Sequence, residues 1–229
     1  QPQPRKQPSQ PKRYKVGDYY NENGKRGVVF YVDETGESGK IVSMQEARHS
    51  WAIDSSFFNG GNPSEKEIGA NNRVDGMVNM RVIQAIEGWQ EKYPAFAWCA
   101  SLGADWYLPA IDELKLLLLN DSVHDAVNKT LKEKEGIMLA DKNHSMFYWS
   151  STEIGNEFAW YVYMIDGNAR KDVKLVSDYV RAVSAFGAAS QPTINETQLP
   201  KQPTQPQPRK QPSQPKRYKV GDYYNENGK

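Results

Sequence analysis

The pattern of apolar and polar positions predicts strands at both ends of the central sequence and helices between them. The apolar runs GVVFYV at 27–32 and KIVSM at 40–44 flank a polar, glycine-containing stretch, which is typical of a β-hairpin. The segment VGDYY at 16–20 predicts a further strand, joined to the hairpin through an Asn-Glu-Asn-Gly turn. The segment 54–72 is rich in Gly, Asn and Ser and is expected to be a loop.

Helical spacing of apolar residues marks the middle of the chain. Residues 75–91 predict a long helix, with Asp75 as a plausible N-cap. A shorter helix is expected at 95–103. A second long helix is predicted at 109–120, where a proline suits the first turn, and a short helical stretch follows at 124–136.

The last third reads as β structure, with aromatic and β-branched runs separated by turns, of which Asp166-Gly167-Asn168 is the clearest. The order is therefore strands, helices, strands, which predicts an α+β fold rather than a βαβ repeat. If the first and last strands pair, the two ends of the domain lie together. The predicted late strands span 147–153, 158–166, 170–177 and 179–186.

Composition divides the chain into one globular domain and extended flanks. Residues 1–13 and 188–217 are mostly Gln, Pro, Lys, Ser, Thr and Arg, so they are expected to be linkers that favour polyproline II. The remaining sequence, 14–187, is rich in Trp and Tyr and long enough for one core.

The chain also contains an internal repeat. Residues 205–229 reproduce 1–25 residue for residue, with a period of 204 positions. We interpret this as one unit of a tandem array, in which 218–229 begins the next domain. A duplication introduced by cloning is the alternative.

Charge and cysteine content exclude several classes of protein. The 29 basic and 28 acidic residues leave a net charge of +1, and no basic stripe points to nucleic acid. No apolar run is long enough to span a bilayer, so direct membrane insertion is not expected. Cys99 is the single cysteine; it lies among Ala, Phe and Trp, which predicts a buried, inert thiol.

No residue pattern indicates catalysis, a metal or a cofactor. The histidines at 49, 124 and 144 are scattered, and His124 is expected to be solvated on a helix surface. The acidic residues at 33, 34 and 37 read as a polar hairpin turn. The adjacent Asp112 and Glu113 are expected to interact with a helix N-terminus. In WSSTE at 149–153 we expect a buried Trp beside a turn held by hydroxyl groups.

Four motifs in order carry a family resemblance. DWYLPAIDEL, YWSSTE, AWYVY and YVRAVSAF, together with the opening VGDYYNENGKRGVVFYVDETGESGKIVSM, resemble the C-terminal domain of the Legionella collagen-like adhesin family and related surface proteins of gut bacteria. The resemblance covers about 14–187. It implies a C-type lectin-like fold with paired N- and C-terminal strands, two main helices and a C-terminal β region. It also implies a scaffold formed by Trp106, Leu108, Pro109, Glu113, Leu114, Trp149, Ser150, Ser151, Glu153, Trp160, Arg181, Val183 and Phe186.

The resemblance also indicates what the domain does. The calcium-binding motifs of lectins and the paired thiols of formylglycine-generating enzymes are absent, so calcium-independent binding without catalysis is expected. In the related retroelement-diversified proteins the variable positions lie between the YWSSTE and YVRAV motifs, which here implies a ligand-contacting surface between 154 and 178. The implied ligand-binding residues are Asn156, Glu157, Phe158, Tyr161, Tyr163, Asp166, Asn168, Arg170, Asp172 and Lys174. The alternative is that half of these side chains face the core or solvent.

Together these observations predict an extracellular or cell-surface, adhesin-like module whose partner is a protein or glycan on a host or neighbouring cell. Tandem copies would add avidity. The alternative is a structural repeat that forms a stalk or filament, with self-association through residues 218–229 exchanging into the place of the first strand of another copy.

Overall fold

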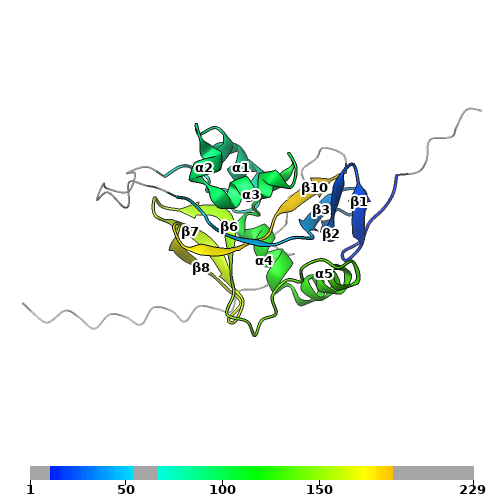
Figure 1. Ribbon diagram of the computed structural model, residues 1–229. Helices are drawn as coiled ribbons and strands as arrows, with labels where there is room; N and C mark the ends of the chain where they lie inside the picture. The colour runs from blue at the N-terminus through cyan, green and yellow to red at the C-terminus, as the bar shows by residue number, and fades with distance from the viewer. Residues whose placement is uncertain (1–10, 54–66, 188–229) are drawn as a thin grey trace, which may run out of the picture.

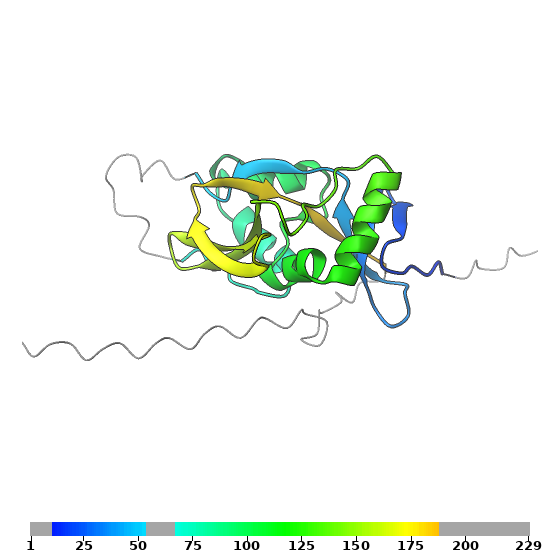
Figure 2. The ribbon, with the colours of Figure 1, turned by 90° about the horizontal axis from the view of Figure 1, so that it is seen from below.

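The computed structural model describes residues 11–53 and 67–187 of the chain, which there form two five-stranded sheets and five helices. Figure 1 shows the two sheets side by side, with α1–α3 on one side and α4 and α5 on the other; Figure 2 shows α4 and α5 from below. This arrangement confirms the predicted α+β class. Most of the predicted linkers at 1–13 and 188–217, the repeat copy at 218–229 and most of the predicted loop lie outside the described residues.

The first sheet combines the N-terminal strands with the last strand. Its order is β1-β2-β3-β10-β5, and every pairing is antiparallel. Asn23 and Gly24 both have positive φ and form the tight turn that places β1 outside β2. β1 is therefore an edge strand, and the last strand pairs with β3 and β5 instead of with β1. The strands are β1 (Tyr19–Glu22), β2 (Lys25–Val32), β3 (Gly39–Ser43), β5 (Trp106–Tyr107) and β10 (Val183–Phe186).

The two ends of the domain lie together, as expected, at the turn between β2 and β3. The backbone N–H of Tyr14 donates to the carbonyl of Gly36 at 2.7 Å. Gly187 packs against the same turn so closely that a Cβ there would lie 2.3 Å from the carbonyl oxygen of Glu37.

The second sheet has the order β4-β9-β6-β7-β8 and contains one parallel pairing, between β6 and β9. The predicted strand 179–186 is in fact two strands in different sheets, because the chain crosses from β9 to β10 at Arg181. The buried guanidinium of Arg181 stabilises this crossover, because it donates hydrogen bonds to the carbonyls of Ser43 at 3.1 Å and Ile137 at 2.8 Å. The strands are β4 (Ala47–Ser50), β6 (Phe147–Ile154), β7 (Phe158–Tyr163), β8 (Asn168–Val173) and β9 (Ser177–Val180).

The two helices predicted to be long are shorter in the structure, and the described residues contain five helices where four helical stretches were predicted. The predicted helix 75–91 ends at Gln84, and a new turn begins after Gly88, whose φ of 67° is left-handed. Asp75 is the predicted N-cap and accepts from the N–H of Met77. The stretch expected to be a short helix from His124 is the longest helix, and it starts three residues earlier, where Asn120 caps it. The helices are α1 (Gly76–Gln84), α2 (Trp89–Lys92), α3 (Pro94–Ser101), α4 (Ile111–Leu119) and α5 (Asp121–Glu133). No helix in the described part of the chain is long and apolar enough to cross a bilayer.

Glu113 joins the first sheet to the helices. Its carboxylate accepts from the ammonium of Lys40 at 2.5 Å, from the hydroxyl of Tyr107 at 2.9 Å and from the N–H groups of Gly76 and Ala110 at 2.8 and 2.7 Å. Both members of the Lys40–Glu113 ion pair are buried. Glu113 therefore contributes far more than the expected favourable charge at a helix N-terminus. Asp112 is also buried, and its carboxylate lies 3.6 Å from nitrogen atoms of Arg73 and Lys115.

Three other expectations can be compared with the structure. Cys99 is fully buried, as predicted, and burial raises the pKa of its thiol. The polar turn is confirmed: Asp33 accepts hydrogen bonds from Ser38 and Thr35, which lower its pKa to about 2. The expectation for His124 is wrong. It is buried, because α5 packs against the segment after it, and its Nε2 lies 3.1 Å from the carbonyl oxygen of Ala140.

Candidate ligand-binding surface

The antiparallel register of β6, β7 and β8 brings aromatic and charged side chains onto one face of the second sheet. Phe147, Tyr163 and Asn168 form one row across the three strands. Trp149, Tyr161 and Arg170 form the next row. Because directly opposed residues in antiparallel strands share a face, and so do residues two apart along a strand, both rows point the same way. We call this side of the sheet, with Phe147, Trp149, Tyr161, Tyr163 and Arg170, the aromatic face; Trp149 and Tyr161 form its buried base.

The aromatic face runs from the core to the surface. Trp149 is fully buried and meets Tyr161 edge-on at 6.0 Å between ring centroids. Tyr161 is 7% exposed and packs edge-on against Phe147 at 5.4 Å. Phe147 and Tyr163 are half-buried and stack with an interplanar angle of 6° and a centroid distance of 4.6 Å. The outer pair is thus held rigidly from below, which lowers the entropy that a ligand contact there would cost.

A charged group borders the exposed end of the aromatic face. The guanidinium of Arg170 lies 5.5 Å from the ring centroid of Tyr163 and forms an ion pair with Asp166. The N–H of Asn168 donates to the Asp166 carboxylate at 3.0 Å. Burial acts to raise the pKa of Asp166, but the hydrogen bonds from Asn168 and the charge of Arg170 outweigh it, so the pKa is lowered. The turn after β7 and the start of β8 therefore place a pair of opposite charges, Asp166 and Arg170, beside Tyr163.

The carboxylate of Asp178 is buried on the same sheet, and neighbouring groups compensate its negative charge only in part. Asp178, on β9, is 4% exposed, and its Oδ2 has no hydrogen-bond partner within the described ranges. Burial raises the pKa of Asp178 to about 6, with repulsion from Asp172 adding to the shift and Arg48 opposing it. Burial also raises the pKa of Tyr161, to which Asp172 and Asp178 contribute. The three groups are therefore electrostatically coupled.

The structure distributes the ten predicted site residues over four environments. Tyr161, Tyr163, Asp166, Asn168, Arg170 and Asp172 lie on the side of the sheet just described or at its bordering turn. Phe158 lies on the opposite side, where the ammonium of Lys171 sits 4.8 Å from its ring centroid. Asn156 and Glu157 occupy the turn between β6 and β7.

Lys174 is a buried structural residue and is not displayed. Its ammonium donates to Glu153 at 2.5 Å and to the carbonyls of Asn156 and Gly155 at 2.8 and 3.2 Å, and it lies 4.6 Å from the ring centroid of Trp51. Burial lowers its pKa, and the Glu153 carboxylate opposes that shift. Lys174 therefore fastens the β6–β7 turn to the core.

Sequence reasoning missed Phe147 as a surface residue. It was assigned to a strand, but its position opposite Tyr163 depends on the register of β6 and β7. Ser145, just before β6, was also missed; its hydroxyl lies 3.5 Å from that of Tyr163.

The hydroxyl groups of WSSTE have the structural role that was expected, in a strand instead of a turn. Ser150 Oγ donates to the carbonyl of Trp160 at 2.7 Å, and Thr152 Oγ1 donates to that of Asn72 at 2.9 Å. Ser151 Oγ accepts from the side-chain amide of Asn79 at 2.9 Å. Within the described ranges, no group of three or more His, Cys, Asp or Glu residues is placed to hold a metal ion.

The comparisons with known proteins agree with this α+β architecture. Residues 64–184, more than half of the chain, match the family model of the Lcl C-terminal domain. The chain therefore belongs to the Lcl C-terminal domain family. Among curated proteins, none matches this sequence.

The fold is also similar to the crystal structure of a fimbrial protein from Bacteroides ovatus ATCC 8483, with a TM-score of 0.53 and 16% sequence identity. The match covers 76% of this chain and 49% of the fimbrial protein, so the chain spans about half the length of that relative. At this level of identity the likeness concerns the fold alone.

Proposed function

We propose that this chain is a non-enzymatic, adhesin-like binding module of the cell surface or extracellular space, and that it contacts its ligand through the aromatic face and the turn after β7. Membership of the Lcl C-terminal domain family supports a surface role. The observation that carries the proposal is the half-buried stack of Phe147 and Tyr163 beside Arg170. Rigid Tyr and Arg side chains are the residue types that dominate binding energy at interfaces.

The partner that suits this surface is a protein or glycan on a host or neighbouring cell, bound without calcium. We further propose that the α+β architecture is C-type lectin-like, which is supported by the shared sheet of the N- and C-terminal strands. The predicted organisation, a domain at 14–187 repeated along Pro/Gln-rich linkers, would then add avidity through effective concentration.

The test is binding of the whole chain to glycan and extracellular-protein arrays, repeated with two single variants. Tyr163→Ala should weaken capture about 30-fold or more, because truncation of an interface hot spot costs roughly 2 kcal/mol or more. The matched control is Lys171→Ala, since Lys171 is an exposed residue of the same hairpin that points to the opposite side. Capture that is equal for Tyr163→Ala and the wild type, or no capture on either array, would count against the proposal.

A second candidate function, assembly through the repeated segment, is favoured by the contacts of Tyr14–Lys25. The backbone N–H of Gly17 donates to the carbonyl of Val29 at 2.8 Å, and the carbonyl of Gly17 accepts from Thr130 Oγ1 at 2.6 Å. The rings of Tyr14, Tyr20 and Phe186 pack together, with centroids 4.9–5.2 Å apart. Every contact that this segment makes could be repeated by the identical residues 218–229 in a second molecule. Because β1 is an edge strand, such an exchange breaks pairing with β2 alone.

The assembly candidate is tested by changing only the copy, which leaves the resident strand intact. Molar mass across a concentration series, measured by light scattering after size exclusion, should reveal dimers or larger species for the wild type. Tyr224→Asp, in the copy of buried Tyr20, should yield monomers. Asn225→Asp, in the copy of exposed Asn21, is the control and should assemble like the wild type. A wild-type monomer at all concentrations, or a Tyr224→Asp variant that still assembles, rejects this candidate.

A further inference from the structure

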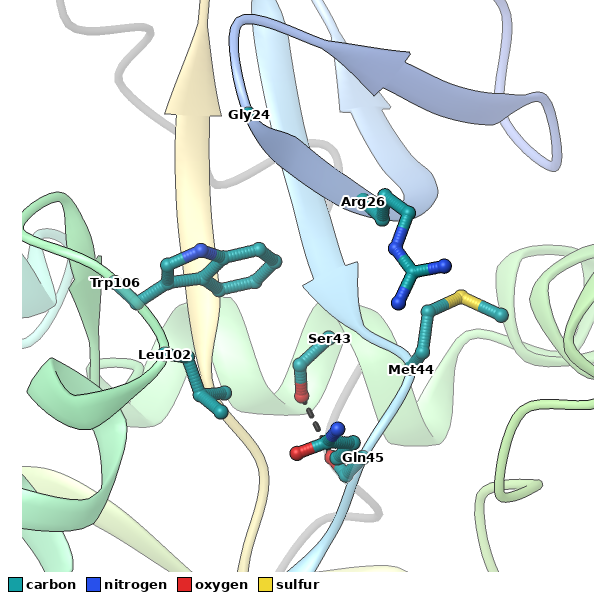
Figure 3. Close-up of a pocket in the computed structure, with 7 residues that line it drawn as sticks. All are labelled: Gly24, Arg26, Ser43, Met44, Gln45, Leu102 and Trp106. Atoms are coloured by element: carbon teal, nitrogen blue, oxygen red, sulfur yellow. Dashed lines mark hydrogen bonds between the residues drawn. The ribbon is translucent and has the colours of Figure 1, made fainter.

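A pocket of about 180 Å³ opens on the first sheet, away from the surface proposed above. Figure 3 shows Arg26 from β2 and Trp106 from β5 on two sides of it, with Ser43 and Gln45 at its lower end. Leu102 and Met44 complete the apolar part of the lining. The volume is below the roughly 300 Å³ at which pockets begin to take drug-sized ligands, so it suits a single ring.

The wall formed by Ser43 and Gln45 is fixed by the buried guanidinium of Arg181. This group donates to the carbonyls of Ser43 at 3.1 Å and Gln45 at 3.2 Å, and Ser43 Oγ donates to the same Gln45 carbonyl at 2.7 Å. This wall of the pocket is therefore formed before any ligand arrives, which reduces the entropic cost of binding.

The backbone around Trp106 positions its indole at the pocket. The backbone N–H of Trp106 donates to the carbonyl of Gly103 at 3.0 Å. Gly103 has a φ of 142°, and a Cβ at this position would lie 3.1 Å from Cδ1 of the indole, so the position favours glycine. The ring is 4% exposed and presents only a limited surface to the pocket.

The charge available to a ligand is a single guanidinium. Arg26 is exposed and has no ion-pair partner within the described ranges. The neighbouring cation, Lys25, is occupied by Asp105 at 3.0 Å and by the carbonyl of Ala185 at 3.1 Å. One unpaired guanidinium matches a monoanion, and its planar fork fits a carboxylate with two parallel hydrogen bonds. A doubly charged phosphate would be left undercompensated.

We propose that this pocket binds a small carboxylate borne on a hydroxylated ring, with the carboxylate on Arg26, the ring against Trp106 and a ring hydroxyl on the side-chain amide of Gln45. The ligand is either an aromatic acid or an acidic sugar, since the rings of both offer a flat or weakly polar face to an indole. The inference does not depend on the aromatic face, which lies on the other sheet, so either proposal can fail alone.

The test is a titration of the ¹⁵N-labelled whole chain, followed at the indole N–H signal of Trp106. That signal is one of six in the chain and is assigned with Trp106→Phe. The probes are 4-hydroxybenzoate and galacturonate, each paired with its neutral counterpart, 4-hydroxybenzyl alcohol or galactose. We expect a saturable shift with millimolar affinity for at least one acid. Arg26→Gln should weaken it about 10- to 100-fold, the usual value of a charge-assisted hydrogen bond.

Arg81→Gln is the matched control, because Arg81 is an exposed arginine of α1 outside the pocket, and it should leave the affinity unchanged. A response to 4-hydroxybenzoate alone identifies an aromatic carboxylate, a response to galacturonate alone identifies an acidic sugar, and a response to both shows that the carboxylate dominates. The proposal is overturned if neither acid shifts the signal, if the neutral counterparts bind equally well, or if Arg26→Gln binds like the wild type.

Discussion

Replacement of Asp178 by Asn should stabilise the protein at neutral pH and lose that advantage in acid. In the folded chain Asp178 is buried beside Asp172, and one of its oxygens lacks a hydrogen-bond partner within the described residues. The folded protein therefore disfavours the charged carboxylate, whereas the unfolded chain does not. Asparagine has nearly the same shape and carries no charge at any pH.

The magnitude follows from the pKa of Asp178, which rises from its usual 3.8 to about 6 on folding. Between these values the folded state binds a proton that the unfolded state has released, so the free energy of unfolding falls as pH rises. At about 1.4 kcal/mol per pKa unit, a shift of roughly two units costs the wild type up to about 3 kcal/mol above pH 6. The cost disappears well below the unfolded pKa of 3.8, at about pH 3, where both states are mostly protonated.

The assay is urea denaturation of the wild type and Asp178→Asn at pH 4, 5, 6 and 7.5, followed by tryptophan fluorescence. The difference in unfolding free energy between the two proteins should shift in favour of the variant by about 2–3 kcal/mol from pH 4 to 7.5. All other titrating groups are common to both proteins and cancel, and any misfit of the amide itself is independent of pH. If the difference in unfolding free energy between the two proteins stays constant within about 0.5 kcal/mol from pH 4 to 7.5, ionisation of Asp178 does not destabilise the wild type and the prediction is wrong.

Three further predictions concern the core. Glu113→Ala should destabilise the fold by about 3–5 kcal/mol in urea denaturation, because it leaves the Lys40 ammonium buried and unpaired. The double variant Lys40→Met/Glu113→Leu should lose less unfolding free energy than Glu113→Ala. A larger loss would show that the ion pair itself stabilises the fold. Gly39→Ala should prevent native folding, seen as lost near-ultraviolet circular dichroism, since a Cβ there would lie 2.2 Å from the carbonyl oxygen of Tyr31; a native spectrum would contradict this. Cys99 should react with a thiol reagent only as fast as the chain opens, so an immediate reaction without denaturant would contradict its burial.

Much of the architecture could be predicted from local pattern, because strongly periodic segments carry their own signal. The hairpin of β2 and β3 and the helix after Pro109 are examples. The elements that were missed depend on distant partners. β4 is polar, with the sequence ARHS, and forms a strand because β9 lies beside it. The break between β9 and β10 at Arg181 follows from carbonyl groups more than 40 positions away in sequence, which no local window contains.

The candidate surface was predictable as a region but not residue by residue. The segment 154–178 could be chosen from its resemblance to a family, yet which side chains point outward is set by register. Lys174 is charged like a surface residue, but Glu153 and the turn carbonyls of Gly155 and Asn156 hold its ammonium inside. Phe147 has the composition of a core residue, but its stacking partner Tyr163 places it at the surface.

The most direct test of the central claim is a hydrogen–deuterium exchange footprint of the whole chain, recorded with and without a ligand captured on the arrays. We expect slowed exchange in β7, in β8 and in the turn at 164–167, with little change in the first sheet. Protection confined to 14–25 would instead support assembly through the repeated segment, and protection confined to the first sheet elsewhere would contradict a binding role for the aromatic face.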